Sequence, residues 1–165
     1  MTETPHLFAG RKTLVLSMAE VKQLLSMTKC IELQHTVFCD HARGAAWSAP
    51  ATWLRVNQHS GWIKIVAGFV DSNDGMGVKM LARYPKNPPG QNLGSLLVLF
   101  DATNGFPLAV FDSVYITGAR TGAGGGLATR HMARPDSRVV GILGAGVQAR
   151  FTLLTIAEQI GRAHV

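Results

Sequence analysis

The chain has 165 residues, of which 47% are hydrophobic and 16% are charged, and its formal net charge is +6. These values fit one globular domain with a sizeable core. No apolar run approaches the roughly 18 residues that span a bilayer, and the N-terminus does not resemble a signal peptide, so we expect no membrane partner. Lys and Arg are scattered, so we expect no nucleic acid partner. Cys30 and Cys39 are not in a C-x-x-C pattern, and we expect a reduced, cytoplasmic protein.

Two helices are predicted near the N-terminus. Ser17 and Glu20 have the spacing of a capping box at the start of a short helix. Thr28 is a candidate N-cap for a second helix, in which apolar residues recur at helical spacing until Gly44 ends it. Residues 45–52 are mostly small or polar and predict a loop.

A run of β-strands follows. Alternating apolar residues predict strands over Trp53–Val56, Trp62–Phe69, Gly77–Tyr84 and Leu93–Phe100. The last of these predicts a hairpin with Leu108–Phe111 around Asn104-Gly105, a pair typical of tight turns. The prolines between Tyr84 and Gly90 predict a loop, because proline cannot donate to a strand ladder.

Residues 113–133 are predicted to be helical in part, although five glycines fall inside the stretch, at positions 118, 122 and 124–126. Each glycine costs about 1 kcal/mol relative to alanine in a helix interior. Either the helix breaks at these positions or another segment packs very close to it. A P-loop is excluded, because the glycines are not followed by Lys and Ser or Thr.

A dinucleotide-binding motif is predicted near the C-terminus. Val139–Leu143 has the pattern of a buried strand, and Gly144-x-Gly146-x-x-Ala149 then leads into an apolar helix. Gly144 would allow the tight turn and Gly146 the close approach of a pyrophosphate, which indicates a nicotinamide or flavin nucleotide. The chain ends before the acidic residue, about 20 positions on, that would bind the ribose. We therefore predict an α/β protein with a first domain over 1–134 and the start of a truncated Rossmann domain over 135–165.

The last residues of the chain match a sequence that is not part of a natural gene. Gln159-Ile-Gly-Arg-Ala-His-Val165 is what a common sequencing adapter encodes in one reading frame. We expect residues from about 160–165 to be translated adapter and the natural chain to continue. The alternative is a natural terminus that matches by chance.

Three cations are candidates for a binding site. Pattern alone places Lys79 on a solvent-facing side of a strand, Arg120 on a helix surface and Arg55 in a rim salt bridge. The functional alternative is a cleft in which arginines capture a carboxylate and a lysine transfers a proton. The histidines show no ligand spacing, so no metal is expected.

Many ordered motifs, spread from about Leu14 to Ala157, carry a resemblance to a known family. They are Leu16-Ser-x-x-x-Val21-x-x-Leu-Leu25-x-Met27, Gly77-Val-Lys79, Tyr84-Pro-x-Asn87, Leu99-Phe-Asp101-x-x-x-Gly105-x-Pro-Leu-Ala109, Arg120-Thr121-x-Ala123, Ala133-Arg-x-Asp-Ser137 and Gly144-x-Gly-x-Gln148-Ala-Arg150. At this spacing they resemble the N-terminal half of the ornithine cyclodeaminase/mu-crystallin family.

The resemblance implies a substrate-binding and dimerisation domain rich in β-structure, followed by a Rossmann domain for NAD or NADP. It implies that Arg55, Lys79 and Arg120 contact the substrate carboxylate and that Lys79 also transfers a proton, which replaces the solvent-facing interpretation of this lysine. The cofactor-binding residues it implies are Thr121, Gly144, Ala145, Gly146, Val147 and Gln148.

The implied activity of the full-length protein is hydride transfer at the α-carbon of a small amino acid or cyclic imino acid, in a homodimer. Cyclodeaminases of this family go on to convert ornithine to proline with release of ammonia. The alternatives are a mu-crystallin-like protein that binds a ligand without turnover, or a truncated product without function. Relatives usually carry Ala, Ser or Thr at positions 122 and 124–126, and the carboxylate that acts as acid and base is absent. We expect the 165-residue chain itself to be inactive and poorly docked from about residue 135 onward.

Overall fold

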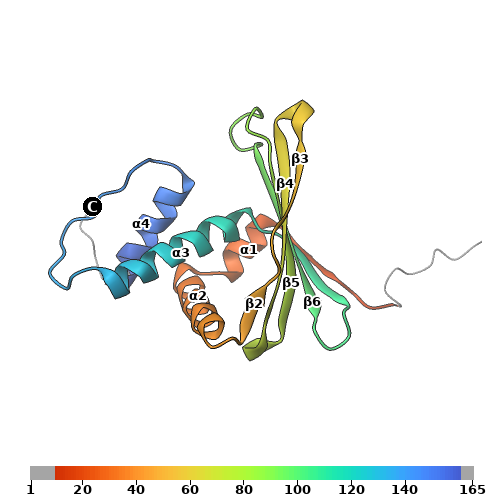
Figure 1. Ribbon diagram of the computed structural model, residues 1–165, viewed down its shortest axis with the longest axis horizontal. Coiled ribbons are helices and arrows are strands. Elements are labelled where there is room, and N and C mark those ends of the chain that lie inside the picture. The colour runs from red at the N-terminus through yellow and green to blue at the C-terminus, as the bar shows by residue number, and fades with distance from the viewer. Residues whose placement is uncertain (1–9, 161–165) are drawn as a thin grey trace, which may run out of the picture.

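The structure is a computed structural model that describes residues 10–160. Residues 161–165, which hold most of the expected adapter sequence, lie outside the described residues. The described part is a twisted sheet with helices on one side only (Figure 1). None of its helices has both the length and the apolarity needed to cross a bilayer.

The sheet has seven strands, and its centre is an antiparallel meander. The strands are β1 (Leu14–Leu16), β2 (Ala46–Ser48), β3 (Thr52–Val56), β4 (Gly61–Val70), β5 (Gly75–Arg83), β6 (Leu93–Asp101) and β7 (Pro107–Asp112). Their order is β1-β7-β6-β5-β4-β2, with β3 also paired to β4 and β1 parallel to β7. The five strands from β3 to β7 confirm the predicted strands and hairpin, with ends that differ by one or two residues.

Two strands were not predicted. β2 lies inside the expected loop over 45–52, so that part of the prediction was wrong, and β1 precedes the first helix. Each has three residues, which is too short for period-two alternation to be detected. Both are formed by pairing with distant strands, β2 with β4 and β1 with β7.

The four helices are α1 (Met18–Leu24), α2 (Met27–Ala42), α3 (Val114–Met132) and α4 (Val147–Ile160). The capping box at α1 is confirmed: the Ser17 N–H donates to Glu20 Oε2 at 2.8 Å, and Ser17 Oγ accepts from the Glu20 N–H. The predicted cap of α2 was wrong by two positions. Ser26 is the N-cap and accepts from the Lys29 N–H at 3.1 Å, while the Thr28 hydroxyl donates to Glu158 on α4.

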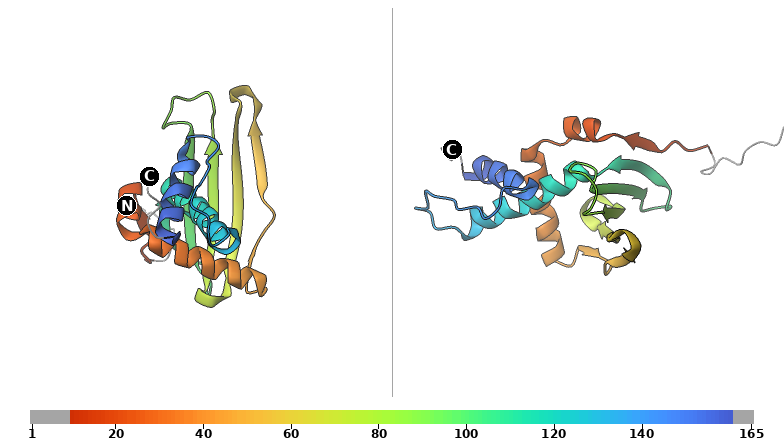
Figure 2. Two further views of the ribbon diagram at one scale, coloured as in Figure 1. Left: turned by 90° about the vertical axis from the view of Figure 1, so that its left-hand side faces the viewer. Right: turned by 90° about the horizontal axis from the view of Figure 1, so that it is seen from above.

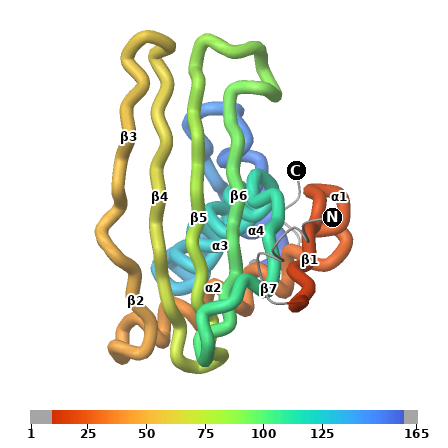
Figure 3. Tube along the Cα trace, turned by 90° about the vertical axis from the view of Figure 1, so that its right-hand side faces the viewer, coloured from red at the N-terminus to blue at the C-terminus, as the bar shows by residue number. Residues whose placement is uncertain are grey.

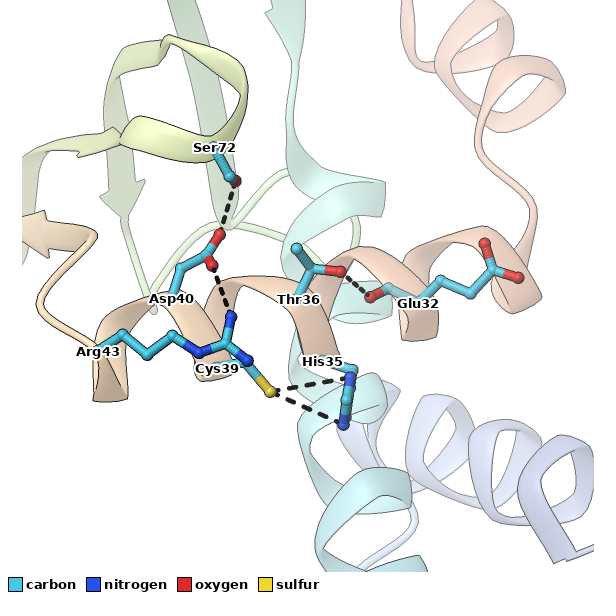
Figure 4. Close-up of polar contacts among 7 residues, drawn as sticks. All are labelled: Glu32, His35, Thr36, Cys39, Asp40, Arg43 and Ser72. Atoms are coloured by element: carbon cyan, nitrogen blue, oxygen red, sulfur yellow. Dashed lines mark hydrogen bonds and ion pairs between the residues drawn. The ribbon is translucent and has the colours of Figure 1, made fainter.

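The C-terminal end of α2 is fixed to the sheet by a buried carboxylate. Asp40 is 5% exposed and accepts a hydrogen bond from the Ser72 hydroxyl at 2.6 Å, in the turn between β4 and β5 (Figure 4). Arg43 lies 3.7 Å from the same carboxylate. Gly44, with a φ of +77°, follows the last turn of the helix as predicted. This contact holds α2 beside the β4–β5 end of the sheet.

The glycines of α3 do not break the helix, which runs unbroken for 19 residues. They allow α4 to pack against it, as both views of Figure 2 show. A Cβ on Gly122 would lie 2.6 Å from the Phe151 carbonyl carbon, and one on Gly126 would lie 2.8 Å from Thr155 Cβ. The Thr155 hydroxyl donates to the Gly122 carbonyl at 2.7 Å. Of the two predicted alternatives, a broken helix or a closely packed neighbour, the structure has the closely packed neighbour.

The segment from Arg134 to Gly146 differs from the prediction. Val139–Leu143 forms no strand, and Val139 is 87% exposed. This stretch pairs with none of the described strands, so its backbone groups join no ladder. The expectation that everything beyond residue 135 is poorly docked was nevertheless wrong for α4, which is packed on α3. The division of the chain into domains over 1–134 and 135–165 stays a prediction.

Candidate functional site

Lys79 lies in the middle of β5 on the side of the sheet that faces the helices. It pairs with Val66 on β4 and Leu97 on β6. Alternation places Lys64, Val66, Lys79, Arg83 and Leu97 on this side, which we call the helix side of the sheet. The pattern-based placement of Lys79 toward solvent was wrong, because its side chain is half-buried.

Lys79 borders a groove of about 440 Å³ between the C-terminal end of α2, β2 and the sheet. The groove is open partly because Gly68 and Gly77, which pair with each other, place no side chain on the helix side next to Lys79. Its other walls are mainly apolar, including Val66 and Leu97. Burial here, together with the charges of Arg120 and Lys64, lowers the pKa of Lys79 from 10.5 to about 8.

Arg120 lies in the second turn of α3 and comes close enough to Lys79 for its charge to affect the lysine's pKa. The structure therefore brings together two of the three predicted substrate-binding cations. Arg120 remains exposed. Thr121 is half-buried, and its hydroxyl donates to the Thr117 carbonyl at 2.7 Å within the same helix.

Arg55, the third predicted cation, is on the same side of the sheet but farther from Lys79. It lies on β3 and pairs with Trp62 on β4, so β4 separates it from β5. Its side chain is exposed, and none of the ion pairs among residues 10–160 involves it. The rim salt bridge that pattern alone favoured is therefore not formed.

Lys64 is a residue of this site that the sequence did not single out. It pairs with Leu81 on β5 and with Trp53 on β3. Its diagonal neighbours on the helix side are therefore Lys79 and Arg83 on β5 and Arg55 on β3. Its Nζ lies 5.0 Å from the centre of the Trp53 ring. Alternation along β4 places Lys64 on the same side as Lys79 only when the register of β4 against β5 is known, and the sequence does not give that register.

The predicted phosphate-binding turn lines a second cleft of about 650 Å³. Gly144 has a φ of +97°, and Gly146 immediately precedes α4. A Cβ on either glycine would meet no other atom within 4 Å, so the backbone is open to a ligand. Val147 and Gln148 also line the cleft, and Arg83 faces them from the end of β5. Ala145 lies in the same exposed turn.

A pyrophosphate group fits the chemistry of this second cleft. Free N–H groups at the start of a 14-residue helix attract an anion, and Arg83 adds a positive charge. Arg83 and Lys79 are four residues apart on one side of β5, roughly 13 Å along the strand. In the part of the chain that the structure describes, no group of His, Cys, Asp and Glu is arranged to hold a metal ion.

Comparison with known proteins identifies the family of the chain. A sequence model of the ornithine cyclodeaminase/mu-crystallin family matches residues 11–165. An alanine dehydrogenase from Archaeoglobus fulgidus is 34% identical over 144 residues, which are 86% of this chain and 44% of the relative.

Two solved structures have the same fold. The Δ1-pyrroline-2-carboxylate reductase of Thermococcus litoralis, in complex with NADH and L-proline, superposes with a TM-score of 0.83 at 34% identity, covering 89% of this chain and 46% of that one. The iminosuccinate reductase of Paracoccus denitrificans, in complex with NAD+, gives a TM-score of 0.85 at 26% identity, covering 92% and 48%. The chain thus spans about half the length of the relatives it matches, and it belongs to the ornithine cyclodeaminase/mu-crystallin family.

Proposed function

We propose that this chain is the substrate-binding half of an NAD(P)-dependent amino or imino acid oxidoreductase. It also contains the glycine-rich turn and first helix of the nucleotide-binding domain. The observation that carries the proposal is the half-buried Lys79, with a pKa of about 8, beside Arg120. A lysine with a pKa near neutrality can both donate and accept a proton at working pH, unlike an ordinary surface lysine.

The cations on the helix side of the sheet have distinct roles in this proposal. Arg120 and Arg55 bind the α-carboxylate, since guanidinium groups can donate two parallel hydrogen bonds to a carboxylate. Lys79 contacts the same carboxylate and exchanges a proton with the amine or imine. Fixing the carboxylate orients the α-carbon for hydride transfer, which is a contribution from positioning.

The cofactor-binding role belongs to the glycine-rich turn. Backbone N–H groups of Gly144, Ala145, Gly146, Val147 and Gln148 would bind the pyrophosphate of NAD or NADP, and we assign Thr121 on α3 to the same cofactor. When bound, the cofactor supplies or accepts the hydride. NADH and NAD+ are bound in the two solved structures described above, which supports this assignment.

We propose that the protein works as a homodimer through the side of the sheet that no helix covers, which Figure 3 shows in front. This bare face carries apolar residues in adjacent strands, namely Ile65, Val78, Met80, Leu96, Val98, Phe100 and Val110. Leu96 is 46% exposed at the centre of the sheet. Such a surface is typical of a protein interface, and the archaeal alanine dehydrogenase with bound NAD is a dimer.

Two finer functions are alternatives. One is the cyclisation of ornithine with release of ammonia, as in the cyclodeaminases of the family. The other is ligand binding without turnover, in the manner of the mu-crystallin branch. Both would use the same carboxylate site, so they differ from the proposed reaction in turnover and product rather than in binding.

The proposal is tested by expressing the source gene together with whatever coding sequence follows the codon for Glu158. Oxidation of NADH or NADPH that depends on an added imino acid, or on a 2-oxo acid together with ammonia, would support it, and proline formed from ornithine would identify a cyclodeaminase. Tight substrate binding without any hydride transfer would favour the crystallin-like alternative. A genuine stop codon after Val165 would remove the enzymatic role from this gene product.

A further inference from the structure

The strands β2 to β5 and the helix α3 around the candidate substrate site carry positive charges and no acidic side chains. On α2, which also borders the groove, Asp40 is buried and bonded to Ser72 and Arg43, and Glu32 is paired with Lys29. The sequence has no Asp or Glu between Asp40 and Asp71 or between Asp74 and Asp101, and none between Asp112 and Asp136. These three intervals contain β2 to β5, all of α3 and β6 up to its last residue. The ion pairs among the described residues involve none of the site cations.

Lys64 lies among the other cations of this site. Lys79, Arg83 and Arg55 are its diagonal neighbours on the helix side, and its charge lowers the pKa of Lys79. Like charges so close together disfavour the empty site, and bound anions relieve this repulsion. A single α-carboxylate held by Arg120, Arg55 and Lys79 supplies one negative charge to a group of cations that also includes Lys64, so most of the positive charge stays uncompensated.

The contact between Lys64 and Trp53 does not remove this charge. A cation–π contact attracts the ammonium to the ring face, but the ring carries no net charge. The 5.0 Å contact therefore orients Lys64 and leaves its positive charge in place. Trp53 and Trp62 also pack against each other, with ring centres 4.9 Å apart, and this pair borders Lys64 and Arg55.

We propose that the substrate carries a second anionic group, so that the site takes a dicarboxylic amino or imino acid, and that Lys64 binds the distal carboxylate. This inference rests on the proposed function, since it assigns the substrate class of the same site. The same charges disfavour a diamino acid, because its terminal ammonium would meet cations and no carboxylate on these elements. Lys64 is thereby a specificity-determining residue that does not take part in the proton transfer.

The inference is tested on the 165-residue chain with three amino acids that share a four-carbon chain and differ in the terminal group. L-aspartate, L-2-aminobutyrate and L-2,4-diaminobutyrate end in a carboxylate, a methyl group and an ammonium, respectively. Their dissociation constants are measured by calorimetry or by chemical-shift titration of the folded chain. We expect aspartate to bind about tenfold more tightly than 2-aminobutyrate, as a charge-assisted hydrogen bond allows, and diaminobutyrate to bind most weakly.

Two variants and one control separate the role of Lys64 from a general effect. Lys64→Met should remove the preference for aspartate over 2-aminobutyrate. Lys64→Arg should retain the preference, which guards against a Met variant that fails to fold. Lys86→Met, on the exposed loop after β5, removes the same charge away from the site and should change nothing.

The outcomes distinguish this inference from the proposed function. Equal binding of aspartate and 2-aminobutyrate, or a preference for aspartate that survives Lys64→Met, overturns the inference and leaves the carboxylate site intact. Preferred binding of diaminobutyrate overturns it as well. If none of the three amino acids binds to the folded chain, the proposed substrate site is itself wrong.

Discussion

The two sides of the central sheet come from the same strands but have opposite characters. On β5, Gly77 and Lys79 face the helices, whereas Val78 and Met80 face away from them. One side carries partly buried cations beside a groove, and the other is apolar and uncovered. Alternation along a strand thus lets one short segment contribute to a polar site and to an apolar surface at once. If the two proposals hold, the difference predicts that substrate binding and assembly can be changed separately, by substitutions one residue apart.

The largest effect should come from removing the charge on the helix side. Lys79→Met keeps most of the side-chain volume but removes proton transfer, and we expect turnover in the full-length protein to fall by about 10²- to 10⁴-fold. The measurement is the rate of NAD(P)H oxidation with saturating imino acid. Met80→Lys, which places a charge on the other side of the sheet, should leave substrate binding by the protomer unchanged. Unchanged turnover in Lys79→Met would remove Lys79 from the mechanism.

A charge on the bare face should instead affect assembly. Val78→Lys puts an ammonium at the centre of the proposed dimer interface, where burial of an unpaired charge costs several kcal/mol. We expect the dimer dissociation constant to rise at least about 100-fold, measured by sedimentation or light scattering across a concentration series. Substrate binding per protomer should stay the same. A wild-type chain that remains monomeric at high concentration would contradict the proposed interface.

The pH dependence of stability should also separate the two sides. The pKa of Lys79 is lowered in the folded chain from 10.5 to about 8, so between these values the unfolded chain binds more protons than the folded one. Stability should therefore rise with pH from about 8 to 10.5. Because the ammonium is only partly buried, we expect a contribution of roughly 1 kcal/mol. Urea unfolding of the wild type and of Lys79→Met at several pH values measures it, since the variant lacks this component of the rise.

Two glycine substitutions give the smallest expected effects. A Cβ on Gly77 would lie 3.0 Å from the Val98 carbonyl oxygen, whereas one on Gly94 would meet nothing within 4 Å. We expect Gly77→Ala to destabilise the chain by about 1 kcal/mol and Gly94→Ala to be neutral or slightly stabilising. Thermal unfolding compares them directly. Equal effects of the two substitutions would mean that the backbone next to Lys79 is less tightly packed than described.

Local patterns in the sequence predicted the long elements, and tertiary pairing decided the rest. The hairpin around Asn104-Gly105 and the capping box at Ser17 are local signals, and both were found. β1 and β2 could not be predicted, since each depends on a partner strand far along the chain. The strand expected over Val139–Leu143 has the right pattern but no neighbour to pair with among the described residues.

The residues of the candidate site also fall into those that the sequence predicted and those that only the fold brings together. Lys79 and Arg120 were selected because the resemblance identified their motifs, and their proximity is visible only in the fold. Lys64 and Arg83 have no motif of their own, and they join the site through the registers of β4 and β5. A register is set by contacts between strands rather than by either strand alone, so these two residues were beyond the reach of sequence reasoning.

The close packing of α4 against the glycines of α3 has a mechanical consequence. Arg120 is two residues from Gly122, whose carbonyl accepts a hydrogen bond from Thr155 on α4, and α4 begins directly after the phosphate-binding turn. Arg120, which we propose binds the carboxylate, and the turn that we propose binds the pyrophosphate are therefore carried by the same tightly packed helix pair. A motion that opens or closes the cleft cannot separate these two helices without breaking their backbone contact. Any such motion has to move the sheet and Lys79 relative to the pair, and it is opposed at the junction of β7 and α3, where the buried Ser113 is hydrogen-bonded to Ser95 on β6.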